Sequence, residues 1–320
     1  MEVNKIIHSD FLDNNLPDKC AKLIIADPPY FEVKGDFDFI WSSFEDYLKD
    51  VEKWAVECKR ILADNGTLFW WGHAKKIAYS QIILDKYFNL ENNLKWRKTD
   101  CQTRIGFSSF RSFPPVTEHI LMYSNEIGMT GLEFIDKEYI APRNPFANEL
   151  KKARLKKGVS INQVAEYGKF YGNVNHGGAI TNWENGYNVP LKEQWEILCE
   201  NLPIERQEYE ELRQEYEELR RPFNNVLKLE DVMDFAQDVH ISRKYNHDTV
   251  KPETLTRALI NTCSNKGDLV VVPFVGSGTE CAMSAKEGRP FIGYEKELKH
   301  VITARERVDV IQKHEARKLF

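Results

Sequence analysis

The chain has 320 residues, of which 42% are hydrophobic and 12% aromatic, so it is long enough for one large α/β domain and a smaller second one. A formal net charge of -5 excludes a protein that is basic all over, so any surface for nucleic acid must be a local patch. The six cysteines form no Cys-x-x-Cys pair, and the sequence predicts neither a metal site nor a disulfide framework. Because no signal peptide and no run of 18 apolar residues is seen, we expect a reduced, cytoplasmic protein.

The first predicted strand covers residues 5–12 and ends at Asp10. An acid at a strand end can cap the next turn or hydrogen-bond a ligand, and both interpretations are open. A second strand is predicted at Leu23–Ala26, buried on both faces, because its apolar residues do not alternate and turn formers follow at once. Asp27 would then project from the carboxyl end of this strand, where open α/β sheets bind ligands.

The four residues Asp27, Pro28, Pro29 and Tyr30 combine a carboxylate, a rigid turn and a flat ring. The prolines remove two backbone donors and leave carbonyl oxygens as acceptors. Such a set suits a planar heterocycle with an amino group, because two acceptors draw that nitrogen toward a tetrahedral geometry and the carboxylate stabilises the developing positive charge. Stacking on Tyr30 would offset part of the cost of taking a base out of a duplex. The alternative is an ordinary surface turn.

The next elements alternate between helices with an apolar stripe and buried strands. They are a helix at 44–62, a turn at 64–66, a strand at 67–72, a helix at 75–87 and strands at 93–98 and 118–123. Residues 99–115 have no periodicity. Their Arg104 and Arg111 could contact a polyanion, or this stretch could be a solvated surface loop.

The sequence pattern of residues 148–203 differs from that of the rest of the chain. A basic helix at 149–157 leads to a turn at Gly158, a cap at Ser160 and a second helix, and later come the segment 180–186, Pro190 and a helix around 195–198. This stretch resembles the helix-turn-helix domain of the Xre and Cro repressor type. The spacer from 168 to 178 is long for that type and leaves the start of the recognition helix open.

The resemblance implies that the second helix of the motif lies in the major groove of DNA. Residues His176, Thr181 and Asn182 would then approach bases. The candidates for phosphate contacts are Lys151, Lys152, Lys156 and Lys157. The alternative is a small helical packing module with a solvated basic face.

A seven-residue repeat follows, in which residues 208–214 recur almost unchanged at 215–221. Two heptads are too short for an independent coiled coil. We expect a charged helical strut at 204–221 that packs on the larger domain and ends at Pro222; pairing with a second subunit is less favoured.

The last part of the chain predicts a helix at 253–264, a strand at 269–272, a glycine-rich turn at 273–279 and a helix at 280–287. A glycine turn between strand and helix lets a ligand approach the backbone, and the absence of a following lysine excludes a P-loop. The strand at 290–295 ends on Glu295, about twenty residues after the glycines, which is the spacing of a carboxylate that holds ribose hydroxyls. These features predict an adenosine-containing cofactor.

Taken together, Asp-Pro-Pro-Tyr at 27–30, His-x-Thr-x-Lys-Pro at 247–252 and Pro-Phe-x-Gly-Ser-Gly-Thr at 273–279 resemble the amino-methylating DNA methyltransferases of the beta arrangement. The resemblance covers residues 4–123 and 222–308. It implies S-adenosylmethionine as cofactor, double-stranded DNA as partner and a seven-stranded Rossmann-like sheet. Position 272 departs from it, because the family usually has Asp before Pro-Phe and this chain has Val272. A nearby acid could compensate, or the cofactor could bind more weakly.

Site residues follow from the resemblance position by position. Asp27, Pro28, Pro29 and Tyr30 would be catalytic, with the Asp27 carboxylate and the Pro28 carbonyl as acceptors. Asp10 and Phe11 would meet the adenine of the cofactor, Glu295 its ribose, and Thr249 and Lys251 its methionine carboxylate. The residues expected to line the cofactor are Asp27, Phe274, Gly276, Ser277, Gly278 and Thr279.

The sequence thus predicts an α/β protein, with a Rossmann-like S-adenosylmethionine-dependent methyltransferase sheet and an inserted small all-α helix-turn-helix domain. The expected parts are a catalytic domain at 1–123 and 222–320, a connection or target-recognition region at 124–147, the helix-turn-helix domain at 148–203 and the strut at 204–221.

We expect methylation of adenine N6, because members that act on cytosine N4 more often have Ser at position 27. The alternatives are cytosine N4, a DNA-binding regulator whose enzyme half has decayed, and, less favoured, a methyltransferase for structured RNA. A homodimer and a cognate restriction endonuclease are open expectations for further partners.

Overall fold

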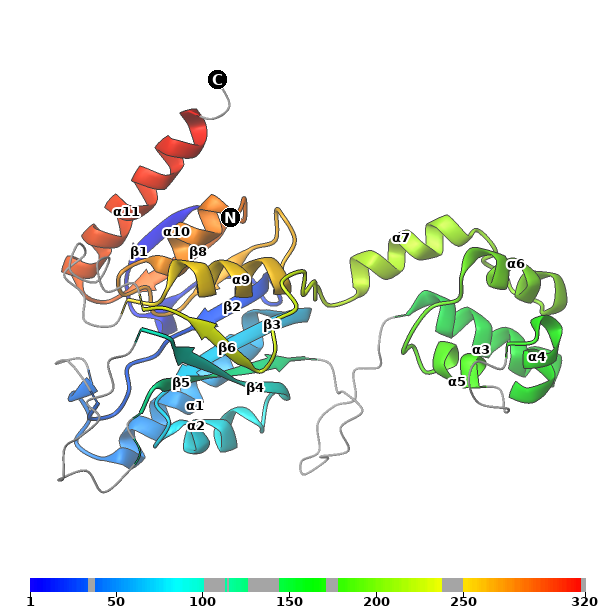
Figure 1. Cartoon of the computed structure of the whole chain (residues 1–320), viewed down its shortest axis with the longest axis horizontal. Coiled ribbons are helices and arrows are strands. Elements are labelled where there is room, and N and C mark those ends of the chain that lie inside the picture. The colour runs from blue at the N-terminus through cyan, green and yellow to red at the C-terminus, as the bar shows by residue number, and fades with distance from the viewer. Residues whose placement is uncertain are drawn as a thin grey trace. The chain divides into compact units, whose positions relative to one another are not determined.

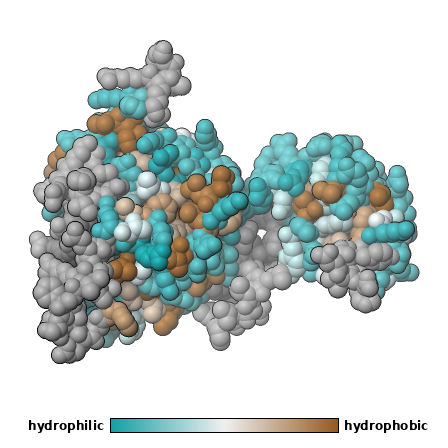
Figure 2. Space-filling model, in the orientation of Figure 1, coloured by the Kyte–Doolittle hydropathy of each residue, from teal (hydrophilic) through white to brown (hydrophobic). Residues whose placement is uncertain are grey.

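The computed structural model describes residues 1–33, 38–100, 113, 115–125, 144–170, 178–237 and 250–317. The chain divides into two compact units, residues 1–139 with 221–320 and residues 140–220. We call them the sheet unit and the helical unit. On the face shown in Figure 2, the coloured surface of each unit is mostly hydrophilic, with small apolar patches. Among the described residues, no helix is long and apolar enough to span a membrane.

The sheet unit is built on an eight-stranded sheet with the order β1-β8-β7-β2-β3-β5-β4-β6. β5 is antiparallel to its neighbours β3 and β4, and the other neighbouring pairs are parallel. The strands are β1 (Lys5–His8), β2 (Ala21–Ala26), β3 (Leu62–Gly72), β4 (Asn89–Lys98), β5 (Thr117–Ser124), β6 (Val232–Phe235), β7 (Val270–Val272) and β8 (Phe291–Glu295).

Helices cover both faces of this sheet (Figure 1). α1 and α2 pack on one face, and α9, α10 and α11 pack on the other. The helices of this unit are η1 (Phe11–Asp13, 3-10), α1 (Phe44–Ile61), α2 (Ile77–Leu84), α9 (Glu253–Cys263), α10 (Thr279–Lys286) and α11 (Leu298–Arg317).

β2 is a central strand, and its burial on both faces confirms the prediction made from its sequence. Ile24 and Ala26 belong to the core beneath α1 and α2, whereas Leu23 and Ile25 belong to the core beneath α9 to α11. This alternation follows from the two-residue period of a strand. Asp27 comes directly after β2, at the carboxyl end of the parallel strands.

Several elements of the structure differ from the prediction. β1 ends at His8 rather than Asp10, because the Asp10 side chain caps η1 by accepting a hydrogen bond from the amide of Leu12. β3 begins at Leu62 and includes the residues predicted as a turn, since Leu62 already pairs with Ala21. The sequence also did not predict α11.

The expectation of seven strands was wrong by one for the described part of the chain. The additional strand, β6, extends the sheet edge by pairing in parallel with β4. The indole of Trp96 donates a hydrogen bond to the Phe235 carbonyl oxygen at 2.9 Å, and Arg97 pairs with Asp234. Four residues with one buried side chain carry too weak an alternation to be recognised from sequence.

The helical unit contains five helices in its described residues. Gly158 ends α3 with a φ of 72°, and Ser160 forms a capping box with Gln163 at the start of α4, so both predicted signals are confirmed. The helices are α3 (Pro145–Lys157), α4 (Ile161–Gly168), α5 (Gly178–Glu184), α6 (Lys192–Asn201) and α7 (Tyr209–Leu219).

α7 contains most of the seven-residue repeat, and it does not pack where the sequence suggested. It belongs to the helical unit, where it packs on α3 and α6. Leu212 is fully buried in the core of the helical unit, and Tyr209 contacts the Phe146 ring at a centroid distance of 5.3 Å. The apolar stripe of the repeat therefore completes this small core.

Candidate active site

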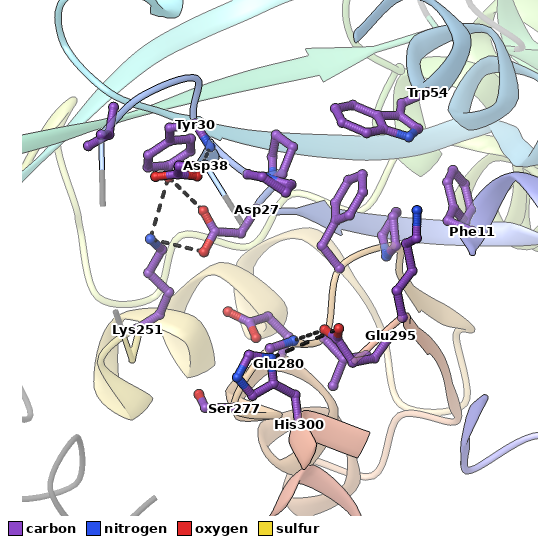
Figure 3. A pocket seen from close by; sticks show the side chains of 18 of the residues that line it. Phe11, Asp27, Tyr30, Asp38, Trp54, Lys251, Ser277, Glu280, Glu295 and His300 are labelled. Atoms are coloured by element: carbon purple, nitrogen blue, oxygen red, sulfur yellow. Dashed lines mark hydrogen bonds and ion pairs between the residues drawn. The ribbon is translucent and has the colours of Figure 1, made fainter. Parts of the chain in front are cut away.

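A pocket of about 770 Å³ lies at the carboxyl ends of four parallel strands of the sheet unit (Figure 3). Its walls come from the segments that follow β1, β2, β7 and β8, so side chains far apart in sequence meet at one sheet edge. Because Asp27 and Glu295 both line it, the pocket joins the two motifs that the sequence placed in different halves of the chain.

At one end, Asp27 is held by two partners. Tyr30 donates its hydroxyl hydrogen to Asp27 Oδ1 at 2.6 Å, and Lys251 Nζ lies 3.0 Å from Asp27 Oδ2. Lys251 also pairs with Glu118 at 3.1 Å, and Lys98 pairs with the same glutamate at 2.6 Å. The result is a buried network in which one lysine serves two carboxylates.

The charges of this network shift the pKa values of its members. Burial raises the pKa of Asp27, and the ion pair with Lys251 and the hydrogen bond from Tyr30 oppose that rise. Burial also acts on Glu118, but its two lysine partners outweigh it and lower the pKa of Glu118 to about 2. Lys251 has a raised pKa because its two carboxylate partners outweigh its own burial. Lys251 is therefore charged over the whole range in which the protein would work.

Aromatic rings line the other end of the pocket. Phe274 contacts Trp54 and Phe11 edge to face, at centroid distances of 4.9 and 6.3 Å. Tyr294 also contacts Phe11 edge to face, at a centroid distance of 5.7 Å. These rings come from α1, η1, β8 and the turn that follows β7. They form an apolar wall suited to a flat ring system.

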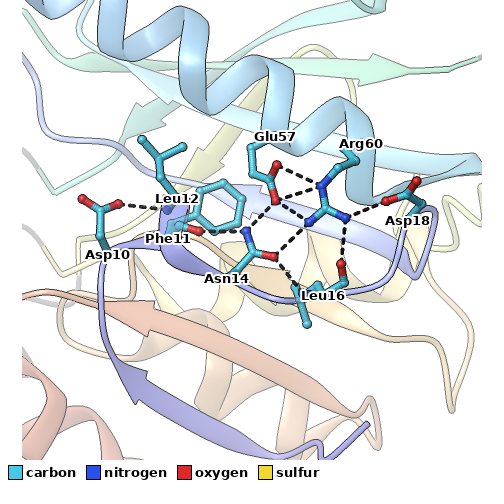
Figure 4. A network of polar contacts seen from close by, with 8 residues as sticks. All are labelled: Asp10, Phe11, Leu12, Asn14, Leu16, Asp18, Glu57 and Arg60. Atoms are coloured by element: carbon cyan, nitrogen blue, oxygen red, sulfur yellow. Dashed lines mark hydrogen bonds and ion pairs between the residues drawn. The ribbon is translucent and has the colours of Figure 1, made fainter.

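A polar network holds Phe11 in this wall (Figure 4). Asn14 donates to the Phe11 carbonyl oxygen at 2.8 Å, and its side chain also contacts Glu57 and Arg60 on α1. Arg60 donates further hydrogen bonds to the Leu16 carbonyl oxygen and to Glu57. The segment after β1 is thus fixed to α1 by charge-assisted hydrogen bonds, which keeps the aromatic wall in place.

The glycine-rich turn after β7 is closed by Glu295. The amide of Gly276 donates to Glu295 Oε2 at 2.8 Å, and the amide of Glu297 donates to Oε1 at 2.8 Å. Gly278 has a φ of 80°, and a Cβ there would lie 2.7 Å from the Cβ of Ala304. Glycine is therefore required at 278 both by the backbone conformation and by the close approach of α11.

Two predicted cofactor residues, Gly278 and Thr279, do not line the pocket. Thr279 is fully buried, and its hydroxyl accepts a hydrogen bond from Arg307 at 2.8 Å. Arg307 also donates to the Ser277 carbonyl oxygen and pairs with Glu253 at 2.7 Å. Gly278 and Thr279 therefore hold the glycine-rich turn against α11 and support the pocket without lining it.

Most of the other predicted residues of the sheet unit do line the pocket. Asp10 lines it while also capping η1 and pairing with Lys296 at 3.0 Å, so its two open interpretations are compatible. Lys251 is there too, but its charge is shared by Asp27 and Glu118. The predicted residues found in the lining are Asp10, Phe11, Asp27, Pro28, Pro29, Tyr30, Lys251, Phe274, Gly276, Ser277 and Glu295.

Several predictions fall outside the described residues: Thr249, Arg104, Arg111, His176 and most of the region 124–147. In the helical unit, Lys152 and Lys156 both pair with Glu205, and Lys157 donates to the Asn201 carbonyl oxygen. Lys151 is exposed on α3. Asn182 is exposed and Thr181 is half-buried on α5.

The pocket residues that sequence reasoning missed include Glu118, Lys98, Trp54 and Glu280. Glu118 and Lys98 lie near the ends of predicted strands, at the sheet edge that carries the site, and that position was the available signal. Glu280 is the second residue of α10 and only 5% exposed. Val272, by contrast, is buried in the core beneath α9 to α11 and does not line the pocket.

Comparison with known proteins shows a protein family and individual proteins to which this chain is similar. The family model described as DNA methylase matches residues 21–306. The chain is 24% identical over 326 residues to the DNA adenine methyltransferase YhdJ of Escherichia coli (strain K12), covering 99% of this chain and 87% of that protein.

Two solved structures share the fold. The M1.HpyAVI–SAM complex has a TM-score of 0.51 at 16% identity, over 95% of this chain and 98% of that one. The cytosine-N4-specific PvuII DNA methyltransferase has a TM-score of 0.54 at 12% identity, over 98% and 93% of the two chains.

Proposed function

The chain belongs to the DNA methylase family, and from this premise we propose that it is a sequence-specific DNA methyltransferase that acts on the N6 amino group of adenine in double-stranded DNA. The methyl donor is S-adenosylmethionine. The observation that carries the proposal is a single pocket with Asp27 and Tyr30 at one end and an aromatic wall beside Glu295 at the other. A base and an adenosine cofactor would each find the groups they need there.

The cofactor end of the pocket fits S-adenosylmethionine. The aromatic wall of Phe11, Trp54 and Phe274 suits the adenine ring, and Glu295 at the end of β8 suits the ribose hydroxyls. Glu280 adds a buried carboxylate for a cationic ligand. When bound, the cofactor supplies a methyl group on a positively charged sulfur.

The other end fits the amino group of a flipped base. Asp27 already accepts one hydrogen bond from Tyr30 and pairs with Lys251, but a carboxylate offers about four lone-pair sites and can accept another donor. By accepting from the amino group, Asp27 would orient the nitrogen lone pair and stabilise the positive charge that develops on methylation. Lys251 keeps Asp27 ionised, because a nearby cation favours the carboxylate form.

The preference for adenine rests on Asp27 and on the similarity to a relative named as an adenine methyltransferase. The fold does not discriminate between the two bases, since a cytosine-N4 enzyme shares it. Cytosine N4 is therefore the second candidate, and it differs from the first in the modified base that a sequencing experiment would detect.

We further propose that the helical unit is the helix-turn-helix domain that reads the DNA sequence. Its support is local: Gly158 ends α3, Ser160 caps α4, and α5 packs on both helices through Ile180 and Trp183. The side chain of Asn182 projects to solvent from α5, as a base-reading residue must. The main alternative is a packing module, which would leave Asn182 without a role.

A regulator with a decayed enzyme half is not favoured by the pocket. Asp27 and Glu118 of the pocket are both paired with Lys251, the turn at Gly276 is closed by Glu295, and Val272 fills the core instead of interrupting the pocket lining. A buried lysine between two carboxylates is costly, because all three charges must lose water. A decayed site would be under no constraint to keep it.

The function is tested by modification-sensitive sequencing of DNA from cells that express the wild type, Asp27→Ala or the exposed control Asp309→Asn. We expect N6-methyladenine at one short motif with the wild type and the control, and none with Asp27→Ala. N4-methylcytosine at a motif would move the assignment to the second candidate. No modification by the wild type, together with binding to duplex DNA, would favour the regulator.

The helical unit is tested by Asn182→Ala, with the exposed Asn92→Ala of the sheet unit as control. If Asn182 reads a base, its loss should reduce discrimination between the target and other sequences by about 1–3 kcal/mol. Unchanged discrimination in a folded variant would contradict the role of Asn182 and weaken the assignment of α5.

A further inference from the structure

Glu280 is a buried carboxylate of the pocket that lacks a cationic or side-chain partner within the described residues. It is 5% exposed, it lines the pocket, and only its own backbone amide hydrogen-bonds to it. The neighbouring acids are held by the chain itself: Asp27 by Tyr30 and Lys251, and Glu295 by two backbone amides. A carboxylate in this position must either keep its proton or receive a cation from a ligand.

The cations that face Glu280 are already engaged. Lys251, which precedes α9, is shared by Asp27 and Glu118. Arg307 of α11 is held by Glu253, Thr279 and the Ser277 carbonyl oxygen. Burial, and then the charge of Asp27 at the end of β2, raise the pKa of Glu280 to about 7, while Lys251 and Arg307 only partly oppose this rise.

Figure 3 shows Glu280 between the Asp27–Lys251 pair and Glu295. The amino-acid portion of S-adenosylmethionine is attached at the sulfur, and so is the ribose. If Glu295 holds the ribose and Asp27 holds the amino group to be methylated, the sulfur and its substituents lie in the part of the pocket that Glu280 lines.

We propose that Glu280 is a further cofactor-binding residue, whose carboxylate accepts hydrogen bonds from the α-ammonium group of the methionine portion and gives up its proton when the cofactor binds. This assignment rests on the proposed function. The ammonium group is chosen over the sulfonium because it offers up to three N–H donors, whereas a sulfonium has none and would leave the carboxylate lone pairs unsatisfied.

The experiment is isothermal titration calorimetry on the full-length wild type, Glu280→Gln and the exposed control Glu306→Gln. Three probes separate the parts of the ligand. S-adenosylhomocysteine has the ammonium but no sulfonium, S-adenosylmethionine has both, and 5′-methylthioadenosine lacks the amino acid. Titrations in buffers of different ionisation enthalpy measure the protons released on binding.

We expect Glu280→Gln to weaken S-adenosylhomocysteine and S-adenosylmethionine by a similar factor, about 10- to 100-fold, because a charge-assisted hydrogen bond is lost. Binding of 5′-methylthioadenosine should be unchanged, which also shows that the variant pocket is intact. At pH 6 the wild type should release nearly one proton per S-adenosylhomocysteine bound. Its affinity should rise about tenfold per pH unit up to neutral pH and then level off, and Glu280→Gln should show neither effect.

Equal affinities of the wild type and Glu280→Gln for S-adenosylhomocysteine would overturn the assignment of Glu280 and leave the proposed function standing. Weakening confined to S-adenosylmethionine would overturn it in favour of the sulfonium. If Glu280→Gln fails to bind 5′-methylthioadenosine, its pocket is not intact, and the test becomes proton release by the wild type. No proton release on binding of S-adenosylhomocysteine at pH 6 would then refute the assignment. A wild type that binds neither adenosyl ligand would overturn the proposed function and this assignment with it.

Discussion

The two units of the chain differ in how they bury charge. In the sheet unit, buried acids outnumber their cations at the pocket, where Asp27 and Glu118 share Lys251 and Glu280 has no cation. In the helical unit, the two nitrogens of Arg154 meet the two oxygens of Glu184 at 2.5 and 2.8 Å. A matched pair fixes helices against one another, whereas an unmatched buried acid must keep its proton or receive a cation from a ligand.

The largest effect should come from Lys251→Met, which removes the cation that two carboxylates share. We expect the free energy of unfolding to fall by about 3–5 kcal/mol, because uncompensated buried charges remain. The pKa of Asp27, already raised by burial, should rise further, since the cation that opposes the rise is gone. Methyl transfer should then be lost at neutral pH and partly recovered at higher pH, as a pH–rate profile would show.

Arg154→Met in the helical unit is the matched control for this change. It removes one partner of a half-buried ion pair, so it should lower the stability of the helical unit. It should leave the pH–rate profile of methyl transfer unchanged, because Arg154 is not a pocket residue. An identical profile for the wild type and Lys251→Met would contradict the view that the buried cation tunes Asp27.

The next effect tests whether the two units have separate cores. Leu198 is fully buried with Trp195 and Leu150 in the helical unit, so Leu198→Ala should cost about 2–5 kcal/mol there. Binding of S-adenosylhomocysteine should be unaffected, since no residue of this core lines the pocket. Thermal unfolding and calorimetry measure the two quantities.

Leu155→Ala, at a side chain that is 61% exposed, is the control and should change stability by less than about 0.5 kcal/mol. A loss of cofactor binding in Leu198→Ala would show that the units depend on each other.

A smaller effect should appear in the ligand-free protein when Glu280 is replaced by Gln. A carboxyl group whose pKa rises from 4.5 in the unfolded chain to about 7 in the folded one prefers its proton when folded. The wild type therefore loses stability as pH rises from 4.5 to 7, by at most about 3 kcal/mol, and Glu280→Gln does not.

Glu280→Gln should accordingly melt at a higher temperature than the wild type at pH 8 and at a similar one at pH 4.5. Differential scanning calorimetry at the two pH values provides the comparison, with Glu306→Gln as the exposed control. A variant less stable than the wild type at pH 8 would mean that the Glu280 carboxylate has a favourable partner in the folded protein.

The smallest effect concerns the basic face of the helical unit. Lys151 is exposed, whereas Lys152 and Lys156 are paired with Glu205. If Lys151 contacts a phosphate, Lys151→Ala should weaken DNA binding several-fold for all sequences and reduce the slope of log K against log salt by about 1. Titrations at several salt concentrations measure this, with Lys49→Ala of the sheet unit as control. An unchanged slope would exclude this phosphate contact.

Local patterns were enough to predict many of the elements. The continuous apolar residues 23–26 predicted a buried strand, and Gly158 with Ser160 predicted the boundary between two helices, because these signals depend only on neighbouring residues. Sequence also predicted that Asp27 and Gly276 would line a ligand site, since Asp27 directly follows β2 and Gly276 lies in the turn that follows β7. By contrast, β6 and the packing of α7 depend on partners distant in sequence, Trp96 and Phe146, and were missed or misplaced.

By itself, the sequence determined the buried strand that ends at Ala26, the helix boundary at Gly158 and Ser160, and the chemistry of Asp27 to Tyr30, because these depend on backbone preferences and on the residue types themselves. Only the tertiary structure decided which charges meet. It brought Lys251 to Asp27 and Glu118 across 224 and 133 positions of the chain, placed Val272 in the core and left Glu280 in the pocket without a cation. Charge pairing depends on distance and burial, and neither is encoded in the identity of a residue or of its neighbours in sequence.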